Sequence, residues 1–338
     1  MRILSKNSKD RLWDYMARFQ AVPSLPVINS LSDNNKTSRK NIKIKKIQNG
    51  VLEATIMDGS SESDRIVDHN DSRNNICIIN VPFPNNYGHC LHDVIPQLLY
   101  LDQQSKYDKI YTSGADVLHS LLEMIQVKFK KIHFIGQEEE LVMNCTGVEI
   151  QNWPAYHKRD VNKTRLIKQA IDKFIKNNIK AEINNRLIYC TRNTSSDVKH
   201  GRMMNHENEI VELLKKYCDE NNLLFTMFDG QENGKTMSHI KQLELFNEAR
   251  VVVGPHGSAM ANVIYLNPEN NPKICEFCSG TEVQVHGSKF DKHYNFLFGY
   301  LFEEIYDYNL IPFDKSSTPE FTSIDVGNLQ KFIKKRMI

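Results

Sequence analysis

The sequence lacks any apolar segment long enough to cross a membrane. A spanning helix needs about 20 consecutive apolar residues, and no window of this chain approaches that length. The first residues, MRILSKNSKDRLWDY, also lack the apolar core of a signal peptide. We therefore expect a cytoplasmic protein without a transmembrane segment, and one that can still associate peripherally with a membrane.

A strong net charge is missing as well. The chain has 43 Lys and Arg residues against 41 Asp and Glu residues, which gives a formal net charge of +2. This charge is too small to indicate binding to nucleic acid. Apolar residues make up 40% and charged residues 25%, which is typical of a globular protein. With 338 residues, the chain exceeds the usual size of one core, and two domains are expected.

The cysteines lack the spacing of a zinc site or a disulfide framework. They are seven, an odd number, and most of them lie in apolar runs where a thiol packs as a small apolar side chain. Cys275 and Cys278 could form half of a zinc site, but no second pair at zinc spacing follows. We therefore expect reduced thiols.

The chain has instead a regular alternation of short apolar runs with helical patterns, which predicts βαβ units on parallel sheets and an α/β fold. A polar break at 180–185 sets the boundary between a domain over 1–180 and a domain over 181–315, and the last helix, within 316–338, can pack back on the first domain.

Residues 1 to about 45 are expected to be loosely ordered, and 60–75 to form a charged loop. The expected strands are 47–57, 76–81, 109–112, 132–135, 141–150, 186–191, 223–228, 250–253, 273–277 and 304–308. The expected helices are 11–19, 89–100, 115–127, 161–178, 205–221, 236–249, 258–266, 290–300 and a terminal helix from Val326.

The segment RVVVGPHGSAMANVIYLNPENNPKICEF, residues 250–277, is the most informative stretch. Its apolar, β-branched strand ends at a glycine turn, and a short helix begins at Ser258, so that backbone N–H groups and a helix N-terminus can meet an anion. A second buried strand ends near the acid Glu276, which could accept hydrogen bonds from a ribose. The segment is interpreted equally well as a nucleotide site or as an ordinary strand–helix turn with Ser258 as the helix cap.

Two further segments carry residues that are suited to chemistry. In NYGHCLHD, His89 and Asp93 are four residues apart on one helix face, and a carboxylate beside an imidazole is a plausible general base. Alternatively, Asp93 favours the helix end and His89 packs or caps. In the segment after the strand over 186–191, Arg192 and Arg202 precede a helix that starts at Asn205. Paired guanidinium groups bind a diphosphate well, although arginines on a solvated loop are also common.

These segments occur in the order NYGHCLHDVIPQL, RLIYCTRN…GRMMNHENEI and VVVGPHGSAMANVIYL…ICEF, and together the chain resembles glycosyltransferase family 61. That family includes plant xylan xylosyl- and arabinosyltransferases and animal enzymes that add N-acetylglucosamine to O-mannose or to EGF-like domains. Two features of the chain differ from the family: members in animals and plants usually have a secretory anchor, and a bulky aromatic residue usually stands where this chain has Cys90.

The resemblance implies a GT-B fold, which is two Rossmann-like domains with parallel sheets facing across a cleft, and inversion at the anomeric carbon. It implies that the first domain is the acceptor side and that the second binds the nucleotide sugar. It places His89 and Asp93 on the acceptor side. The residues that it places on the nucleotide side are Arg192, Arg202, Asn205, His256, Gly257, Ser258, Ala259, Asn262 and Glu276.

From the sequence we therefore expect an inverting glycosyltransferase that takes a sugar from a nucleotide sugar, UDP-linked, such as UDP-GlcNAc or UDP-xylose, and transfers it to a hydroxyl group of a glycan or glycoconjugate acceptor. Asp93 is the expected base, with His89 assisting. No cofactor or metal is expected, because cationic side chains and backbone N–H groups stabilise the leaving diphosphate, and no Asp-x-Asp motif occurs. Two alternatives are another GT-B-like surface-polysaccharide transferase, moving pyruvate or a sugar phosphate, and a non-catalytic nucleotide-sugar-binding module.

Overall fold

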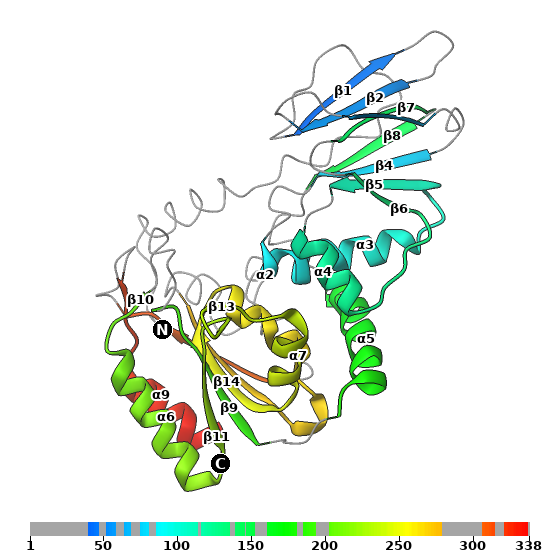
Figure 1. The fold of residues 1–338 in the computed structure, drawn as a ribbon. Coiled ribbons are helices and arrows are strands. Elements are labelled where there is room, and N and C mark those ends of the chain that lie inside the picture. Colours follow the sequence, from blue (N-terminus) through cyan, green and yellow to red (C-terminus); the bar gives the residue numbers. More distant parts are fainter. Residues whose placement is uncertain are drawn as a thin grey trace. The chain divides into compact units, whose positions relative to one another are not determined.

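The computed structural model describes residues 40–46, 52–58, 64–68, 75–80, 86–113, 116–135, 139–145, 147–152, 161–180, 185–193, 203–278, 306–314 and 321–336. These residues fall into two compact units, each with its own parallel sheet (Figure 1). The N-terminal unit holds the described residues up to 152 and Arg165–Ile167, and the C-terminal unit holds 161–164 and the described residues from Lys168 onward. Helix α5 (Val161–Asn178), which contributes to both units, has the bounds that its sequence predicts.

The N-terminal unit contains a parallel sheet whose strands are β4 (Asn75–Asn80), β5 (Lys109–Ser113), β6 (Ile132–Ile135) and β8 (Gly147–Asn152). The spatial order is β6-β5-β4-β8, and every neighbouring pair is parallel. Strand β4 comes first in the chain but lies between β5 and β8, so the order of strands reverses beside it. In open α/β sheets, ligands bind outside the carboxyl ends of strands at such a reversal. The helix that follows β4 is therefore the first place to look for a site.

Helices follow the first two strands of this sheet as expected. After β4 come α2 (Tyr87–His89), the π-helical turn η2 (Cys90–Val94) and α3 (Ile95–Asp102), and after β5 comes α4 (Asp116–Met124). Leu91, Ile95 and Leu98 are fully buried on one face, which confirms the helical spacing. The π-helical middle was not expected, because the wider turn leaves the apolar pattern almost unchanged.

A second sheet in the N-terminal unit differs from the expectation. Its strands are β1 (Lys40–Lys46), β2 (Leu52–Asp58), β3 (Asp64–Asp68) and β7 (Glu139–Cys145), in the order β1-β2-β7-β3. The prediction of a continuous loop over 60–75 was wrong, because β3 has only two apolar residues between charged ones. The single strand predicted over 141–150 is two strands, β7 and β8, which pair in different sheets. An apolar run does not reveal such a change of partners.

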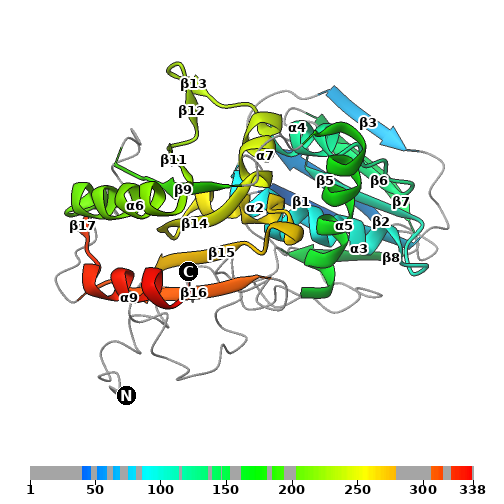
Figure 2. The same ribbon diagram turned by 90° about the horizontal axis from the view of Figure 1, so that it is seen from below.

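The C-terminal unit contains a parallel sheet (Figure 2) of β9 (Arg186–Cys190), β11 (Leu224–Phe228), β14 (Ala249–Pro255), β15 (Lys273–Cys278) and β16 (Asp307–Pro312). The spatial order is β11-β9-β14-β15-β16, with every neighbouring pair parallel. In chain order this is 2-1-3-4-5, a doubly wound arrangement with its reversal between β9 and β14. The predicted strand over 304–308 lies later, at β16, whose position at the sheet edge accommodates Pro312.

Helices cover both faces of this sheet. Leu187, Tyr189 and Val253 on one face pack with α6 (Glu207–Asn221) and α9 (Val326–Arg336), which lie together on one side in Figure 1. Helix α7 (His239–Asn247) and the 3-10 helix η5 (Ser258–Tyr265) pack against each other on the other side (Figure 1). Helix α9 thus contributes to the core of the C-terminal unit, whereas the sequence suggested packing on the first domain.

The remaining elements are short. They are β10 (Met203–Met204), which pairs with β17 (Phe321–Thr322), the hairpin of β12 (Gln231–Glu232) and β13 (Lys235–Thr236), and the 3-10 turn η6 (Pro268–Asn270). Helix α7 starts after this hairpin, three residues later than predicted, because the Ser238 side chain caps it by accepting from the Lys241 N–H. The helices predicted over 11–19 and 290–300 lie outside the described residues. None of the described helices combines the length and apolar character that crossing a membrane requires.

Candidate functional site

The first candidate group lies at the start of the helix that follows β4. The Asn86 side chain caps this helix by accepting a hydrogen bond from the His89 N–H at 3.1 Å. One turn later, His89 Nδ1 and Asp93 Oδ2 are 2.7 Å apart. An ionised carboxylate only accepts hydrogen bonds, so the proton lies on Nδ1. The predicted pairing of His89 with Asp93 is therefore present, in a segment where the helix widens to a π turn.

Burial differs sharply between the two members of this pair. The His89 side chain is 16% exposed and the Asp93 side chain 0% exposed. Buried carboxylates need hydrogen-bond partners, and His89 provides one while its ring reaches the surface. The pair is thus able to accept a proton through the exposed imidazole or, after a local rearrangement, directly on the carboxylate. π-Helical turns of this kind occur frequently at functional sites.

Cys90 stands inside the same turn and is fully buried. Burial, with a smaller effect of the nearby Asp93 carboxylate, raises the pKa of the Cys90 thiol to about 12. A thiol with this pKa stays protonated near neutral pH, and protonated thiols are poor nucleophiles. Cys90 therefore serves as packing and not as a reactive group.

The second candidate group lies at the reversal of the C-terminal sheet, where β9 and β14 end side by side. Arg192 follows β9, and its Nη1 donates a hydrogen bond to the backbone carbonyl of His256, 2.9 Å away, in the turn after β14. The next residue, Gly257, is in contact with the same guanidinium: a Cβ placed there would lie 2.3 Å from Arg192 Nη1. The arginine and the glycine turn, which the sequence treats as separate signals, thus form one structure.

His256 is held by a chain of hydrogen bonds across the next two strands. Its Nδ1 lies 2.7 Å from Glu276 Oε1 in β15, and the hydroxyl of Tyr308 in β16 donates to Glu276 Oε2 at 3.0 Å. The Glu276 side chain is 0% exposed, whereas the His256 side chain is 14% exposed. The sequence predicted Glu276 as a ribose acceptor, but the structure shows its carboxylate buried and bound to two side chains.

The other predicted nucleotide-side residues have mixed surroundings. Asn205 is bound to the β17 region, where its side chain donates to Ser323 Oγ. Asn262 is fully buried and donates to Gln242 Oε1 and the Ala259 carbonyl, so it packs η5 against α7. Ser258 is exposed and Ala259 partly exposed at the start of η5. Arg202 lies outside the described residues.

Three polar residues that contact the strand ends around Arg192 or the His256 pair were missed at the sequence level. Glu207, at the start of α6, accepts hydrogen bonds from Thr191 Oγ1 and from the Tyr189 hydroxyl, at 2.6 and 3.1 Å. Asn193 exchanges two hydrogen bonds with the backbone of Met204. Tyr308 completes the chain to His256. Of these three residues, only Asn193 could have been found from the local sequence, because it comes just after a strand. Glu207 and Tyr308 are distant in sequence from the residues that they contact.

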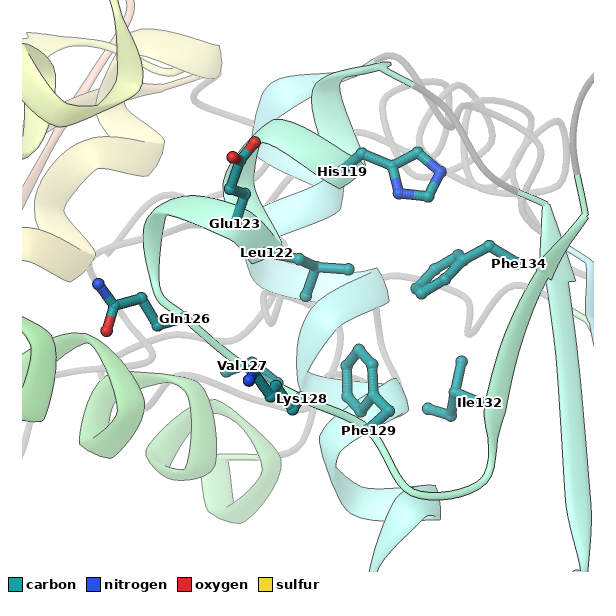
Figure 3. A pocket seen from close by; sticks show the side chains of 9 residues that line it. All are labelled: His119, Leu122, Glu123, Gln126, Val127, Lys128, Phe129, Ile132 and Phe134. Carbon is teal, nitrogen blue, oxygen red and sulfur yellow. The ribbon is translucent and has the colours of Figure 1, made fainter.

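The structure also contains a pocket of about 700 Å³ between α4 and β6 (Figure 3). Its lining is mixed, with Leu122, Phe129 and Phe134 facing it and His119 beside Phe134. None of the predicted site residues lines this pocket. It lies beside the start of β6, away from the carboxyl ends of the strands where a ligand is expected.

The described part of the chain contains no group of three or more His, Cys, Asp or Glu side chains arranged to hold a metal ion. Cys275 and Cys278 are both buried cysteines in β15. Residues three apart on a strand point to opposite faces of a sheet, so these two thiols cannot ligate one ion. The expectation that this pair is structural agrees with its geometry.

A family model matches the chain. The model of the family described as Glycosyltransferase 61 matches residues 87–271, which is more than half of the chain. The matched region begins at Tyr87 in α2 and ends just before β15, so it includes His89, Asp93, Arg192 and Gly257. Glu276 and Tyr308 lie beyond it. No curated protein sequence matches the chain.

Proposed function

The chain belongs to glycosyltransferase family 61, and from this premise we propose that it is an inverting enzyme that moves a sugar from a UDP-linked donor, such as UDP-GlcNAc or UDP-xylose, to a hydroxyl group of a glycan. Family membership itself makes the chain a glycosyltransferase, with a sugar donor and a glycan acceptor as its substrates. The nature of the donor, the stereochemistry and the role of each residue are the proposal.

One observation carries the proposed donor site: the contact of Arg192 with the His256–Gly257 turn at the reversal between β9 and β14. Nucleotides bind doubly wound sheets at this point. A guanidinium binds phosphate oxygens in pairs, and the absence of a side chain at Gly257 lets it lie against the turn. We propose that Arg192, His256 and the backbone N–H groups after Gly257 hold the diphosphate, with Arg202 and Asn205 assisting.

Asp93 is the proposed base of the transfer step. After a local rearrangement that exposes its buried carboxylate, it takes the proton from the acceptor hydroxyl while that oxygen forms a bond to the anomeric carbon. The bond between this carbon and the diphosphate oxygen breaks at the same time, and the nucleoside diphosphate leaves with the electron pair. Attack opposite the leaving group inverts the configuration. Groups placed to stabilise the developing charge, here Arg192 and the turn, usually give the largest part of such an acceleration.

A GT-B architecture is part of the same proposal. The parallel sheets of both units, each with a reversal of strand order and helices after its strands, support it. The division of roles follows from the residues that each unit carries: His89 and Asp93 in the N-terminal unit for the acceptor, and Arg192 and the glycine turn in the C-terminal unit for the donor.

A panel of nucleotide sugars tests the proposed function. A bound ligand raises the melting temperature, by an amount that corresponds to about 2.7 kcal/mol at a hundredfold excess over Kd. We expect UDP-sugars to stabilise the protein and to be hydrolysed slowly, and GDP- and CMP-sugars to do neither. For the best donor, nuclear magnetic resonance of the transfer product should show the opposite anomer. Retention of the anomeric configuration, or no response to any nucleotide sugar, would contradict the proposal.

A further inference from the structure

Glu276 is buried and contacts two side chains, one after β14 and one in β16. Its two carboxylate oxygens accept one hydrogen bond each from His256 and Tyr308, and its side chain is 0% exposed. The β15–β16 register explains the second contact: Tyr308 is paired with Ile274, two residues before Glu276, and so lies on the same face of the sheet. A buried carboxylate is stable only with such partners.

His256 is the member of the Glu276 ion pair that reaches the surface. With Nδ1 held by Glu276, a hydrogen bond from this ring to a ligand is made by Nε2. The backbone carbonyl of His256 accepts the Arg192 hydrogen bond. His256 thus contacts Arg192 through its backbone and Glu276 through its ring. The ring is therefore held beside the arginine proposed to bind the diphosphate.

The hydroxyl of Tyr308 donates to this pair at any working pH. Burial, together with the adjacent Glu276 carboxylate, raises the pKa of the Tyr308 hydroxyl well above its ordinary value. A tyrosine that stays protonated fixes one carboxylate oxygen, which leaves the other aligned with the His256 ring. A diphosphate oxygen accepts hydrogen bonds, so Nε2 is the ring atom that donates to it in this arrangement.

We propose that His256 binds the donor diphosphate through Nε2, and that Glu276 and Tyr308 are positioning residues that hold this imidazole instead of binding the ribose. This inference rests on the proposed function, because it presupposes a nucleoside diphosphate at the reversal between β9 and β14. It extends the site beyond the matched family region to two residues on β15 and β16.

A double-mutant cycle on UDP binding, measured by titration calorimetry, tests the proposal. His256→Ala keeps the backbone carbonyl for Arg192 and removes the ring, so UDP affinity should fall about 10- to 100-fold, the worth of a hydrogen bond to a charged group. Glu276→Gln and Tyr308→Phe should each weaken UDP binding by a smaller factor. In the His256→Ala background, both changes should have no further effect, because residues that act only through the ring lose their influence with it.

Two controls separate a positioning role from a structural one. Tyr306→Phe removes another buried hydroxyl of the same segment, whose hydrogen bond goes to the Leu266 carbonyl at 2.8 Å. It should lower the melting temperature as Tyr308→Phe does and leave UDP affinity unchanged. Uridine has the ribose without the diphosphate, so its weak binding, followed by nuclear magnetic resonance, should be the same in wild type and Glu276→Gln.

The outcomes are distinct. If Glu276→Gln weakens uridine binding, or weakens UDP binding equally with and without His256, the carboxylate contacts the ribose and the proposal is wrong. If Glu276→Gln does not fold, Tyr308→Phe decides in the same cycle. If the wild-type protein binds no nucleoside diphosphate, both the proposed function and this inference are wrong. If the wild-type protein binds UDP and the His256→Ala variant binds it with the same affinity, only the inference is wrong.

Discussion

The Arg192 guanidinium is fixed at the end of β9 by the His256 carbonyl and by the space that Gly257 leaves open. In the same strand and just after it, the hydroxyl groups of Tyr189 and Thr191 donate hydrogen bonds to Glu207 at the start of α6. Burial, reinforced by the Glu207 carboxylate, raises the pKa of the Tyr189 hydroxyl far above its ordinary value. The hydroxyl therefore stays protonated and able to donate its hydrogen bond to Glu207. The arginine is thus preorganised for an anion.

Arg192→Ala should therefore weaken UDP binding by about 1.5–3 kcal/mol, the range for a hydrogen bond to a charged group. Titration calorimetry measures this loss. Arg186→Ala is the matched control, because Arg186 begins the same strand but binds Glu248 and Thr226 at the opposite end. The control should lower the melting temperature and leave UDP affinity unchanged. Unaltered UDP affinity in a folded Arg192→Ala protein would remove Arg192 from the site.

Asp93→Asn should reduce sugar transfer by about 10²- to 10⁴-fold, the usual contribution of a general base, and leave UDP-sugar affinity nearly intact. Single-turnover transfer and calorimetry give the two quantities. Asp102→Asn provides the matched control in the same helical segment, since the Asp102 carboxylate accepts hydrogen bonds from the Lys130 and Lys131 backbone N–H groups. Its loss should affect melting and not turnover.

A purely structural Asp93 would behave differently. Asp93→Asn would then lower stability by about 1–3 kcal/mol, because the buried hydrogen bond to His89 is disturbed, with normal turnover. In that case His89 is the next candidate for the base. If Asp93 is the base, His89→Ala should give an intermediate loss of transfer, because orienting a base contributes less than being the proton acceptor.

At the scale of elements, strand β14 and its turn carry two glycines with different tasks. A Cβ at Gly254 would lie 2.7 Å from the Cys190 carbonyl oxygen and 2.8 Å from its Cβ, on the neighbouring strand β9. The three atoms nearest to a Cβ at Gly257 all belong to the flexible Arg192 side chain, and the Gly257 backbone is extended, at a φ of 165°. Gly254 allows β14 to pack closely beside β9, and Gly257 allows Arg192 to contact the turn.

Alanine at these two positions should therefore have opposite effects. Gly254→Ala should destabilise the protein by about 1–3 kcal/mol, the usual cost of overpacking a core, because β9 and β14 must separate. Gly257→Ala should fold normally and lose UDP affinity by displacing Arg192, with no further loss when Arg192 is already Ala. Melting curves and calorimetry on both variants test this. Equal behaviour of the two variants would contradict the assignment.

At the scale of the whole molecule, the proposed chemistry uses cationic side chains and backbone N–H groups where other enzymes use a divalent ion. We expect full transfer activity in excess EDTA, measured against the same protein with added manganese. The melting temperature should be unchanged by EDTA, which serves as the control for structural damage. Strict dependence on manganese would mean that a carboxylate such as Asp229 holds an ion with the diphosphate.

The sequence by itself determined the α/β class, most strands of the two parallel sheets and the family. These features depend on short-range patterns: a strand buried on both faces is a run of apolar residues, and helix α5 shows its own period over 18 residues. The candidate groups at Asn86–Asp93 and at the glycine turn were equally local, because each is a strand–helix junction within a few residues.

Only the tertiary structure decided which of these signals belong together and what each side chain contacts. Glu276 is 20 residues from His256 and 32 from Tyr308, and strand pairing alone brings the three into contact. The same holds for Arg192 and Gly257, and for the separation of β7 from β8. Partners of a strand are chosen by the packing of the whole sheet, so a carboxylate that the local pattern assigned to a ribose is instead buried beneath an imidazole.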